Sequence, residues 1–192
     1  MTVDRHGQQM TDTGVEAAGH LERALDALLF FRPEVVRECA AAVAAAPGSP
    51  LAQVFAAYLG LLGTEERDAA AAHEKFGRFR AGLDRASVTP RALAHVDAVS
   101  AWLAGDLHEA GRVLGEVSVA CPRDALALMV GHQLDFLTGD AVRLRDRVGG
   151  VLSAWDEEDP HHGPLLGMYA FGLEEAGHYD RSEVVGLAAV AA

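Results

Sequence analysis

Three stretches of the sequence repeat the same punctuation, a single glycine between two segments with helical periodicity. The glycines are Gly105 in AWLAGDLHEAGRVL, Gly139 in DFLTGDAVRLRDRV and Gly177 in MYAFGLEEAGHYDRSEVV. Glycine ends a helix readily because, without a Cβ, it adopts the left-handed conformation that closes the last turn. We therefore expect each glycine to form the turn between two helices, so that the helices of this chain occur in pairs.

The spacing of these glycines gives the length of the repeating unit. The first two lie 34 residues apart and the last two 38 residues apart. A period of 34 residues is that of the tetratricopeptide repeat, a unit of two antiparallel helices. In the clearest unit a small Ala110 lets the two helices approach, Leu114 fills the space beside it, and Pro122 stops the second helix. One additional helical turn in the last unit explains the longer spacing.

Composition favours helix over strand throughout the chain. Alanine is abundant, and it loses no side-chain entropy in a helix. Half of the residues are apolar and 23% are charged, as in a globular protein. The expected fold class is all-α, an α-α superhelix (TPR-like solenoid) of about five antiparallel helix pairs. We expect a flexible N-terminal tail over 1–15 and a TPR-like helical repeat domain over 16–192, with pairs at about 16–46, 51–84, 89–120, 124–155 and 160–192.

Three segments resemble one family of helical-repeat proteins. LLGMYAFGLEEAGHYDRSE (Leu165 to Glu183), with the earlier ALDALLFF and QVFAAYLGLLG (Gln53 to Gly63), resembles the tetratricopeptide repeat protein 38 family. The resemblance implies an α-solenoid without an assigned catalytic residue. The last residues, VVGLAAVAA, depart from the family and lack the polar outer face that a terminal solenoid helix needs. They predict either a truncated piece of a longer solenoid or a last helix that docks on another copy or partner.

Charge and targeting signals restrict the partners and the compartment. The formal net charge of −12 repels phosphates, so nucleic acid is not an expected partner. The basic run from Arg143 to Arg147 is interrupted by Asp146 and is expected to be a solvated helix face. The N-terminus has no apolar signal core, and no run of about 18 apolar residues predicts a membrane span. With Cys39 and Cys121 far apart, the sequence predicts a cytoplasmic protein with free thiols.

Histidine-containing motifs are incomplete for metal binding or catalysis. The pairs His73–Glu74 and His108–Glu109 lack the second histidine of a zinc-protease helix. Two Glu-x-x-His motifs have the spacing of di-iron ligands, but one straddles the Gly177 turn and the other crosses Pro160. The adjacent His161 and His162 are expected in a surface loop. No phosphate-binding glycine loop or nucleophile elbow occurs, so we expect no enzymatic activity, no cofactor and no metal site.

One helical face remains as a candidate binding surface. Residues 10, 6 and 3 positions before each turn glycine share one side of the first helix, which lines the concave groove in proteins with this repeat. The favoured hypothesis is a scaffold that binds a protein or peptide there, with possible self-association through the C-terminal helix. The alternative is a small-molecule-binding protein or enzyme that uses the same histidine and aromatic residues. Packing of the aromatic residues between repeats is the competing interpretation. The candidates are His95, Trp102, Met129, Gln133, Phe136, Phe171 and Glu174.

Overall fold

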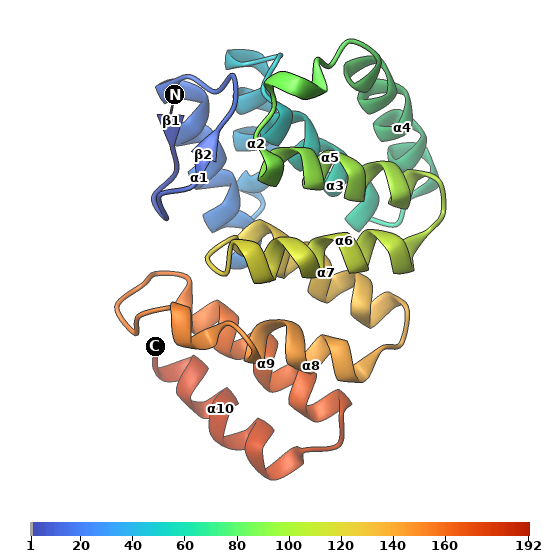
Figure 1. The fold of residues 1–192 in the computed structure, drawn as a ribbon. Helices are drawn as coiled ribbons and strands as arrows, with labels where there is room; N and C mark the ends of the chain where they lie inside the picture. The colour runs from blue at the N-terminus through green and yellow to red at the C-terminus, as the bar shows by residue number, and fades with distance from the viewer. Residues whose placement is uncertain (1) are drawn as a thin grey trace. The chain divides into compact units, whose positions relative to one another are not determined.

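The structure, a computed structural model, describes residues 2–192 and is almost entirely helical (Figure 1). The all-α prediction is confirmed, and two consecutive α-helices fall in each of the five expected ranges. Two short 3₁₀ helices, η1 (Arg85–Ser87) and η2 (Leu152–Ala154), also occur in the described residues. The helices are α1 (Val15–Leu29), α2 (Glu34–Ala45), α3 (Pro50–Leu62), α4 (Glu66–Ala81), α5 (Pro90–Leu103), α6 (Leu107–Ala120), α7 (Ala125–Leu137), α8 (Ala141–Gly149), α9 (His162–Glu175) and α10 (Tyr179–Ala191).

The three glycines that define the sequence repeat form three turns of one kind. Gly105, Gly139 and Gly177 have φ of 85°, 71° and 80°, so each occupies the left-handed region that disfavours a Cβ. At each turn the glycine N–H donates to the carbonyl three residues back, and the next N–H donates to the carbonyl five residues back, at 2.8–3.0 Å. This pair of hydrogen bonds is the Schellman motif, which satisfies the last carbonyls of a helix. The prediction of glycine turns between paired helices is confirmed.

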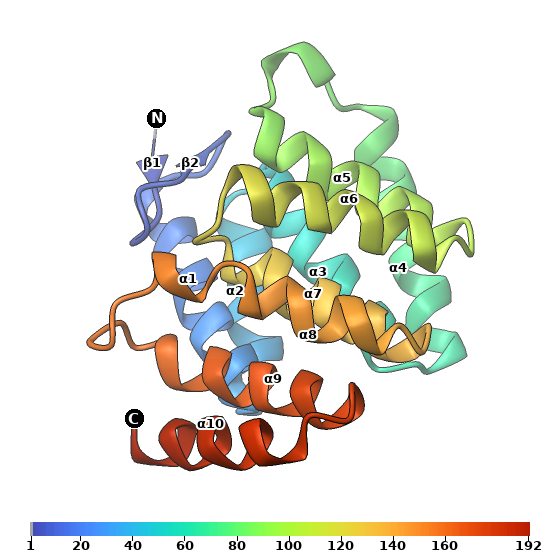
Figure 2. The same ribbon diagram turned by 60° about the horizontal axis from the view of Figure 1, so that its bottom comes forward.

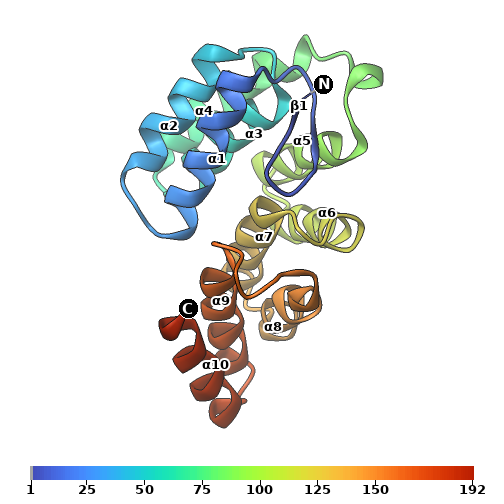
Figure 3. The ribbon, with the colours of Figure 1, turned by 90° about the vertical axis from the view of Figure 1, so that its left-hand side faces the viewer.

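The chain divides into two compact units, one ending at Val113 and one running from Leu114 to Ala192. In the N-terminal unit, α1 packs on α2, α2 packs on α3, and α3 packs on both α4 and α5. Figure 3 shows α1 and α2 side by side in this unit. A Cβ on Gly60 of α3 would lie only 2.9 Å from the Ala72 Cβ of α4, so the missing side chain lets these helices approach closely. Tyr58 of α3 is among the largest fully buried side chains of the unit.

A short hairpin precedes the first helix. Strand β1 (Thr2–Val3) pairs in antiparallel register with β2 (Gln9–Met10). The Arg5 guanidinium donates to both carboxylate oxygens of Asp26 in α1, at 2.8 and 3.0 Å. The structure therefore differs from the flexible tail expected over 1–15, because hydrogen bonds and the buried Met10 attach this segment to the unit. Residue 1 lies outside the described residues.

In the C-terminal unit α9 packs between α8 and α10. Figure 2 shows α9 and α10 lying side by side. A Cβ at Gly172 of α9 would lie 2.7 Å from the Arg145 Cα of α8, so a glycine is required where these two backbones meet. Leu144, Leu165 and Leu173 belong to the core of the unit, each at most 1% exposed.

Candidate binding surface

His95 and Trp102, two of the seven predicted ligand-binding residues, lie in the core of the N-terminal unit. Both belong to α5, and the side of α5 that carries them packs against Tyr58 of α3. His95 is fully buried, with its Nδ1 3.1 Å from the Tyr58 hydroxyl, and the ring centroids of Trp102 and Tyr58 lie 6.3 Å apart. For these two residues, burial against Tyr58 favours the packing interpretation over a position in an open groove. Spacing identified a shared helix side, but it could not show that this side faces a neighbouring helix.

The other five predicted residues belong to the C-terminal unit, and four of them reach its surface. Met129 of α7 is buried in the core. Phe136 of α7 is 46% exposed, and its ring centroid lies 5.4 Å from that of the partly exposed Phe171 of α9. Gln133 is half-buried one turn before Phe136, and Glu174 is exposed one turn after Phe171. We call these four residues, Gln133, Phe136, Phe171 and Glu174, the α7–α9 surface.

The buried His132 supports the α7–α9 surface by contacts with Phe171 and with the backbone of α9. Its ring centroid lies 5.9 Å from that of Phe171, and its Nε2–H donates to the Met168 carbonyl of α9 at 3.0 Å. A carbonyl only accepts, so the proton is on Nε2 and Nδ1 carries a lone pair. Within residues 2–192 this buried Nδ1 has no hydrogen-bond partner. Burial, together with the nearby charge of Arg147, lowers the pKa of His132 to about 4, so the ring is neutral near pH 7.

A buried ion pair lies beside His132 and was not predicted from the sequence. Arg147 of α8 donates to both carboxylate oxygens of Asp135 of α7 at 2.6 and 2.9 Å, and both side chains are 4% exposed. The run from Arg143 to Arg147 was expected to be a solvated face, and for Arg147 that prediction is wrong. Burial raises the pKa of Asp135, and the hydrogen bonds from Arg147 oppose this rise. Gly131 makes the pair possible, because a Cβ there would lie 2.6 Å from Arg147 Cζ.

The N-terminal unit has a second candidate surface, an apolar groove of about 480 Å³ that crosses α3 between α2 and α4. Cys39 contributes to one wall, and burial raises the pKa of its thiol to about 12, so it remains a protonated apolar group. No sequence motif predicted this groove, and alanines from all three helices contribute to its lining. The α2–α4 groove is lined by Val36, Cys39, Ala40 and Val43 of α2, by Gln53, Ala56, Ala57, Leu59 and Gly60 of α3, and by Asp68, Ala71, Ala72, Lys75 and Phe76 of α4.

In a second hollow, beside the hairpin, the hydroxyl groups of the lining residues form hydrogen bonds with other groups of the protein. It has a volume of about 470 Å³ and is lined mainly by residues 10–14 with Ser87 and Thr89. The Thr11 hydroxyl accepts from the Thr89 N–H at 3.1 Å, and the Thr13 and Ser49 hydroxyl oxygens are 2.6 Å apart. These contacts join the hairpin segment to α3 and α5. Its hydroxyl groups therefore have a structural role.

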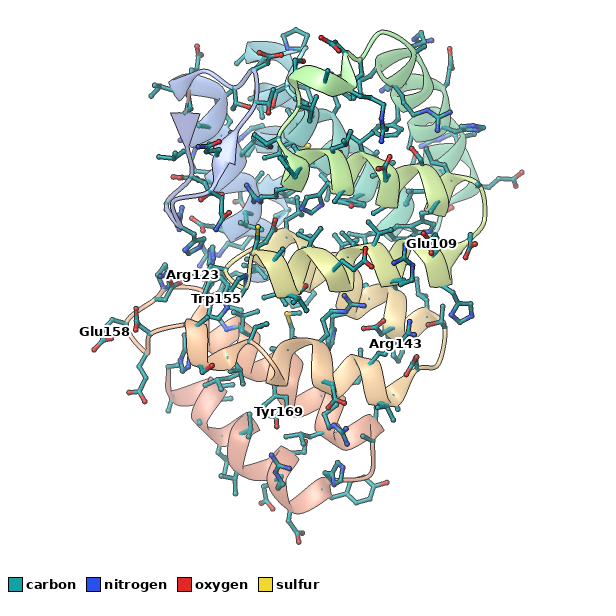
Figure 4. The ribbon with its side chains drawn as sticks, viewed as in Figure 1. Glu109, Arg123, Arg143, Trp155, Glu158 and Tyr169 are labelled. Carbon is teal, nitrogen blue, oxygen red and sulfur yellow. The ribbon has the colours of Figure 1, made fainter. Side chains whose placement is uncertain are left out.

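The histidines near the start of α9 also have structural roles. His161 is fully buried with its ring centroid 6.2 Å from that of Trp155, so its expected position in a surface loop is wrong. The guanidinium of Arg123 lies over the Trp155 ring, 5.5 Å from its centroid. Figure 4 shows Arg123 and Trp155 adjacent, with Glu158 directed away from them on the exposed loop. Glu158 and His161, one of the two Glu-x-x-His motifs, therefore do not share a helix face.

The second such motif is interrupted as expected. Glu175 ends α9, whereas His178 follows the Gly177 turn and precedes α10. His178 Nε2 lies 2.9 Å from the Arg145 guanidinium of α8, so its ring contributes to contact between helices. The two residues therefore do not lie on one continuous helix, as this pair of di-iron ligands requires.

Comparison with known protein families gives no assignment, because no family model matches the sequence. None of the helices in residues 2–192 combines the length and the apolar character needed to cross a lipid bilayer. The function must therefore be argued from the surfaces of the two units themselves.

Proposed function

We propose that this chain is a TPR-like helical-repeat protein that binds a peptide or protein segment at the α7–α9 surface. The observation that carries the proposal is the position of Phe136. Its ring is nearly half exposed, yet it is held against Phe171 on the first helix of the next pair. An aromatic side chain that is both accessible and fixed can be buried by a partner at little cost in conformational entropy.

Local structure supports the helical-repeat part of the proposal. The three glycine turns share one hydrogen-bond pattern, and Gly105 and Gly139 are separated by one tetratricopeptide period. First helices of successive pairs also contact one another, α3 with α5 in one unit and α7 with α9 in the other. This neighbour-to-neighbour packing is what stacked repeats require. The resemblance to the tetratricopeptide repeat protein 38 family points to the same architecture.

The chemistry of the surface favours a peptide-like partner. Phe136 and Phe171 supply apolar contact area, while the Gln133 amide can both donate to and accept from a peptide backbone. The exposed Glu174 adds a negative charge at one end. Together with a net charge of −12, this favours a basic or neutral segment, because complementary charge accelerates encounter and selects among partners.

Panning a random peptide display library against the purified chain tests the proposal without knowledge of the natural partner. Enriched peptides would be synthesised and their affinities measured by fluorescence polarisation. We expect Phe136→Ala to weaken binding by about tenfold or more, as removal of a central aromatic anchor does. Circular dichroism should show that the variant remains helical, since Phe136 is not a core residue.

Val142→Ala is the matched control. Val142 is 57% exposed on α8, the second helix of the same pair, so it removes similar apolar area outside the α7–α9 surface. We expect the selected peptides to bind this variant as they bind the unmodified protein. Equal affinity of the peptides for Phe136→Ala and Val142→Ala would contradict the proposal.

The geometry gives less support to a small-molecule or catalytic site built on histidine and aromatic residues. Its central members, His95 and Trp102, are buried against Tyr58. His132 is buried as well, and its Nε2 is occupied by the Met168 carbonyl. We therefore place the binding function at accessible aromatic residues and not at the histidines.

A further inference from the structure

Helix α10 directs a row of apolar side chains away from its own unit. The Ser182 hydroxyl donates to the Ala170 carbonyl at 2.7 Å, and a Cβ at Gly186 would lie 3.7 Å from the Ala170 Cβ, so this side faces α9. The 3.6-residue period places Val184 and Leu187 on the opposite side, where they are 69% and 67% exposed. The α10 outer row comprises Asp180, Val184, Leu187 and Ala191, bordered by Glu183 and Val190.

The α2–α4 groove matches this row in size and in composition. The small side chains of Ala56 and Ala57 line its floor along α3, so the backbone of an added helix can approach closely. From Gln53 to Gly60 the floor spans seven residues, about 10 Å at the helical rise. Val184 and Ala191 of the α10 outer row are also seven residues apart, about 10 Å.

Charge selects one orientation of a helix in this groove. A Cβ at Gly60 would lie 3.1 Å from the Asp68 carbonyl, so the exposed Asp68 marks the Gly60 end of the groove. The exposed Lys75 lies about two helical turns further along α4, towards the Gln53 end. The acidic side chains in and beside the α10 outer row, Asp180 and Glu183, lie at its beginning. Placing that beginning at Lys75 pairs opposite charges and keeps the carboxylates of α10 away from Asp68.

We infer that the α2–α4 groove of one copy of this chain binds the α10 outer row of a second copy, with α10 parallel to α3. Burial of the exposed Val184 and Leu187 drives the contact, and Lys75 sets its direction. The contact does not use the α7–α9 surface, so it can fail while the proposed peptide binding holds. The reverse also applies.

The expected association is weak and depends on salt in a characteristic way. A three-turn helix in a groove removes on the order of 1,000 Å² from solvent over both partners, near the lower limit for a specific interface. Two copies with a net charge of −12 repel each other, and salt screens this repulsion. The association should therefore tighten as ionic strength rises, whereas an association driven by opposite charges would weaken.

Sedimentation equilibrium over protein concentrations from about 10 to 500 µM measures this association in the micromolar range. We expect the average mass of the full chain to rise with concentration and with added salt. Leu187→Glu on α10 and Ala40→Glu on the wall of the groove should each weaken association by about tenfold or more. Val119→Glu, at a site on α6 that is 83% exposed and outside both surfaces, adds the same charge and should have a much smaller effect.

Mixing the two variants tests which surfaces meet. The Ala40→Glu chain keeps an intact α10, and the Leu187→Glu chain keeps an intact groove, so one complete contact is available between them. We expect the mixture to form heterodimers, detected with a fluorescent label on one chain, although each variant alone stays monomeric. Val190→Glu, at a position that is 89% exposed, replaces Leu187→Glu if circular dichroism shows that the latter misfolds.

Three results would overturn the inference. The first is an unmodified chain that remains monomeric at every concentration and salt level. The second is an association that neither variant weakens beyond the effect of Val119→Glu. The third is a mixture of variants that stays monomeric while the unmodified chain associates, because one intact groove and one intact α10 would then not be sufficient to form the contact.

Discussion

Glu38 in the N-terminal unit and Asp135 in the C-terminal unit are both carboxylates paired with arginine, but their surroundings differ. Glu38 accepts from Arg23 and Arg37 at 2.9 and 3.0 Å, and its Oε2 lies 2.7 Å from His20 Nδ1. The two arginine side chains are 55% and 74% exposed. Asp135 accepts both hydrogen bonds from Arg147, and both of those side chains are 4% exposed.

These different surroundings shift the pKa values of the two carboxyl groups in opposite directions. Hydrogen bonds from His20, Arg23 and Arg37 lower the pKa of Glu38 to about 2. Burial raises the pKa of Asp135, because one arginine does not fully compensate for the loss of water. Both carboxylates are buried, but Glu38 has several donors and can lose one of them, whereas Asp135 depends on a single arginine. The polar cluster beneath the α7–α9 surface should therefore be the more sensitive of the two.

Removing Arg147 should have the largest effect. The variant Arg147→Ala leaves the Asp135 carboxylate buried without its main donor. Breaking a buried ion pair in this way costs roughly 3–5 kcal/mol in free energy of unfolding. Urea denaturation followed by circular dichroism should show early loss of the C-terminal unit.

The double variant Arg147→Met with Asp135→Leu separates the lost pair from lost packing. Two apolar side chains of similar size remove the buried charge together with its partner, so most of the stability should return. If Arg147→Ala alone is as stable as the unmodified chain, the contrast between the two clusters does not hold.

Acid should affect the two units over different pH ranges. His132 has a pKa of about 4 in the folded chain against 6.5 in the unfolded one, so its contribution to stability is complete above pH 6.5 and is lost as pH falls towards 4. The loss from this group is roughly 3 kcal/mol. The pKa of Asp135 is raised, so protonation of this group at low pH favours the folded state, which is opposite to the effect of His132. Glu38, whose pKa is lowered from 4.5 to about 2, loses its contribution only below about pH 4.5.

The variant His132→Gln isolates the histidine, because the glutamine amide can still donate to the Met168 carbonyl. Urea unfolding at pH 7, 5.5 and 4 should show that the unmodified chain loses stability relative to this variant as pH falls. Parallel pH profiles for the two proteins would contradict the assigned burial of a neutral His132.

Two glycines that face Arg147 should respond differently to alanine. A Cβ at Gly131 would lie 2.6 Å from Arg147 Cζ, but a Cβ at Gly115 would lie 3.6 Å from Arg147 Nη1, an ordinary contact. Gly131→Ala must displace the guanidinium from Asp135 and should destabilise by about 1–3 kcal/mol. Gly115→Ala should be neutral or stabilise by up to about 1 kcal/mol, because alanine is the better helix former. Thermal unfolding of both variants measures the difference. Equal changes in their melting temperatures would contradict this explanation of Gly131.

The smallest effect is expected in the N-terminal cluster. Arg37→Ala leaves Glu38 with hydrogen bonds from His20 and Arg23, so the unfolding midpoint should stay within experimental error of the original. The pKa of Glu38, followed by NMR titration of its carboxyl carbon, should rise but remain below its usual range. A large drop in stability would show that this cluster, whose arginines are exposed, is as critical as the Asp135–Arg147 pair.

Local chemistry explains which parts of the fold could be predicted. Gly105, Gly139 and Gly177 were identifiable because a left-handed residue at a helix end favours glycine whatever lies around it. Thr89 and Pro90 start α5 for an equally local reason, with the Thr89 hydroxyl accepting from the Ala92 N–H. Paired helices follow from such signals without knowledge of long-range contacts.

Tertiary contacts explain what could not be predicted. The positions of His95 and Trp102 depend on Tyr58, about 40 residues earlier, and periodicity alone cannot identify that neighbour. Arg147 belongs to a run of alternating charges that usually faces solvent, and only the small Gly131 on another helix makes room for it. By contrast, Phe136 and Phe171 were both placed on the candidate face by their positions before the turn glycines, and their ring centroids lie 5.4 Å apart.

Hydrogen–deuterium exchange of the chain with and without a panned peptide tests most directly where binding occurs. We expect the peptide to slow exchange in α7 around Phe136 and in α9 around Phe171, with little change in α2 and α4. Slowed exchange confined to α2, α3 and α4 would place the peptide in the α2–α4 groove and contradict the assignment of the α7–α9 surface.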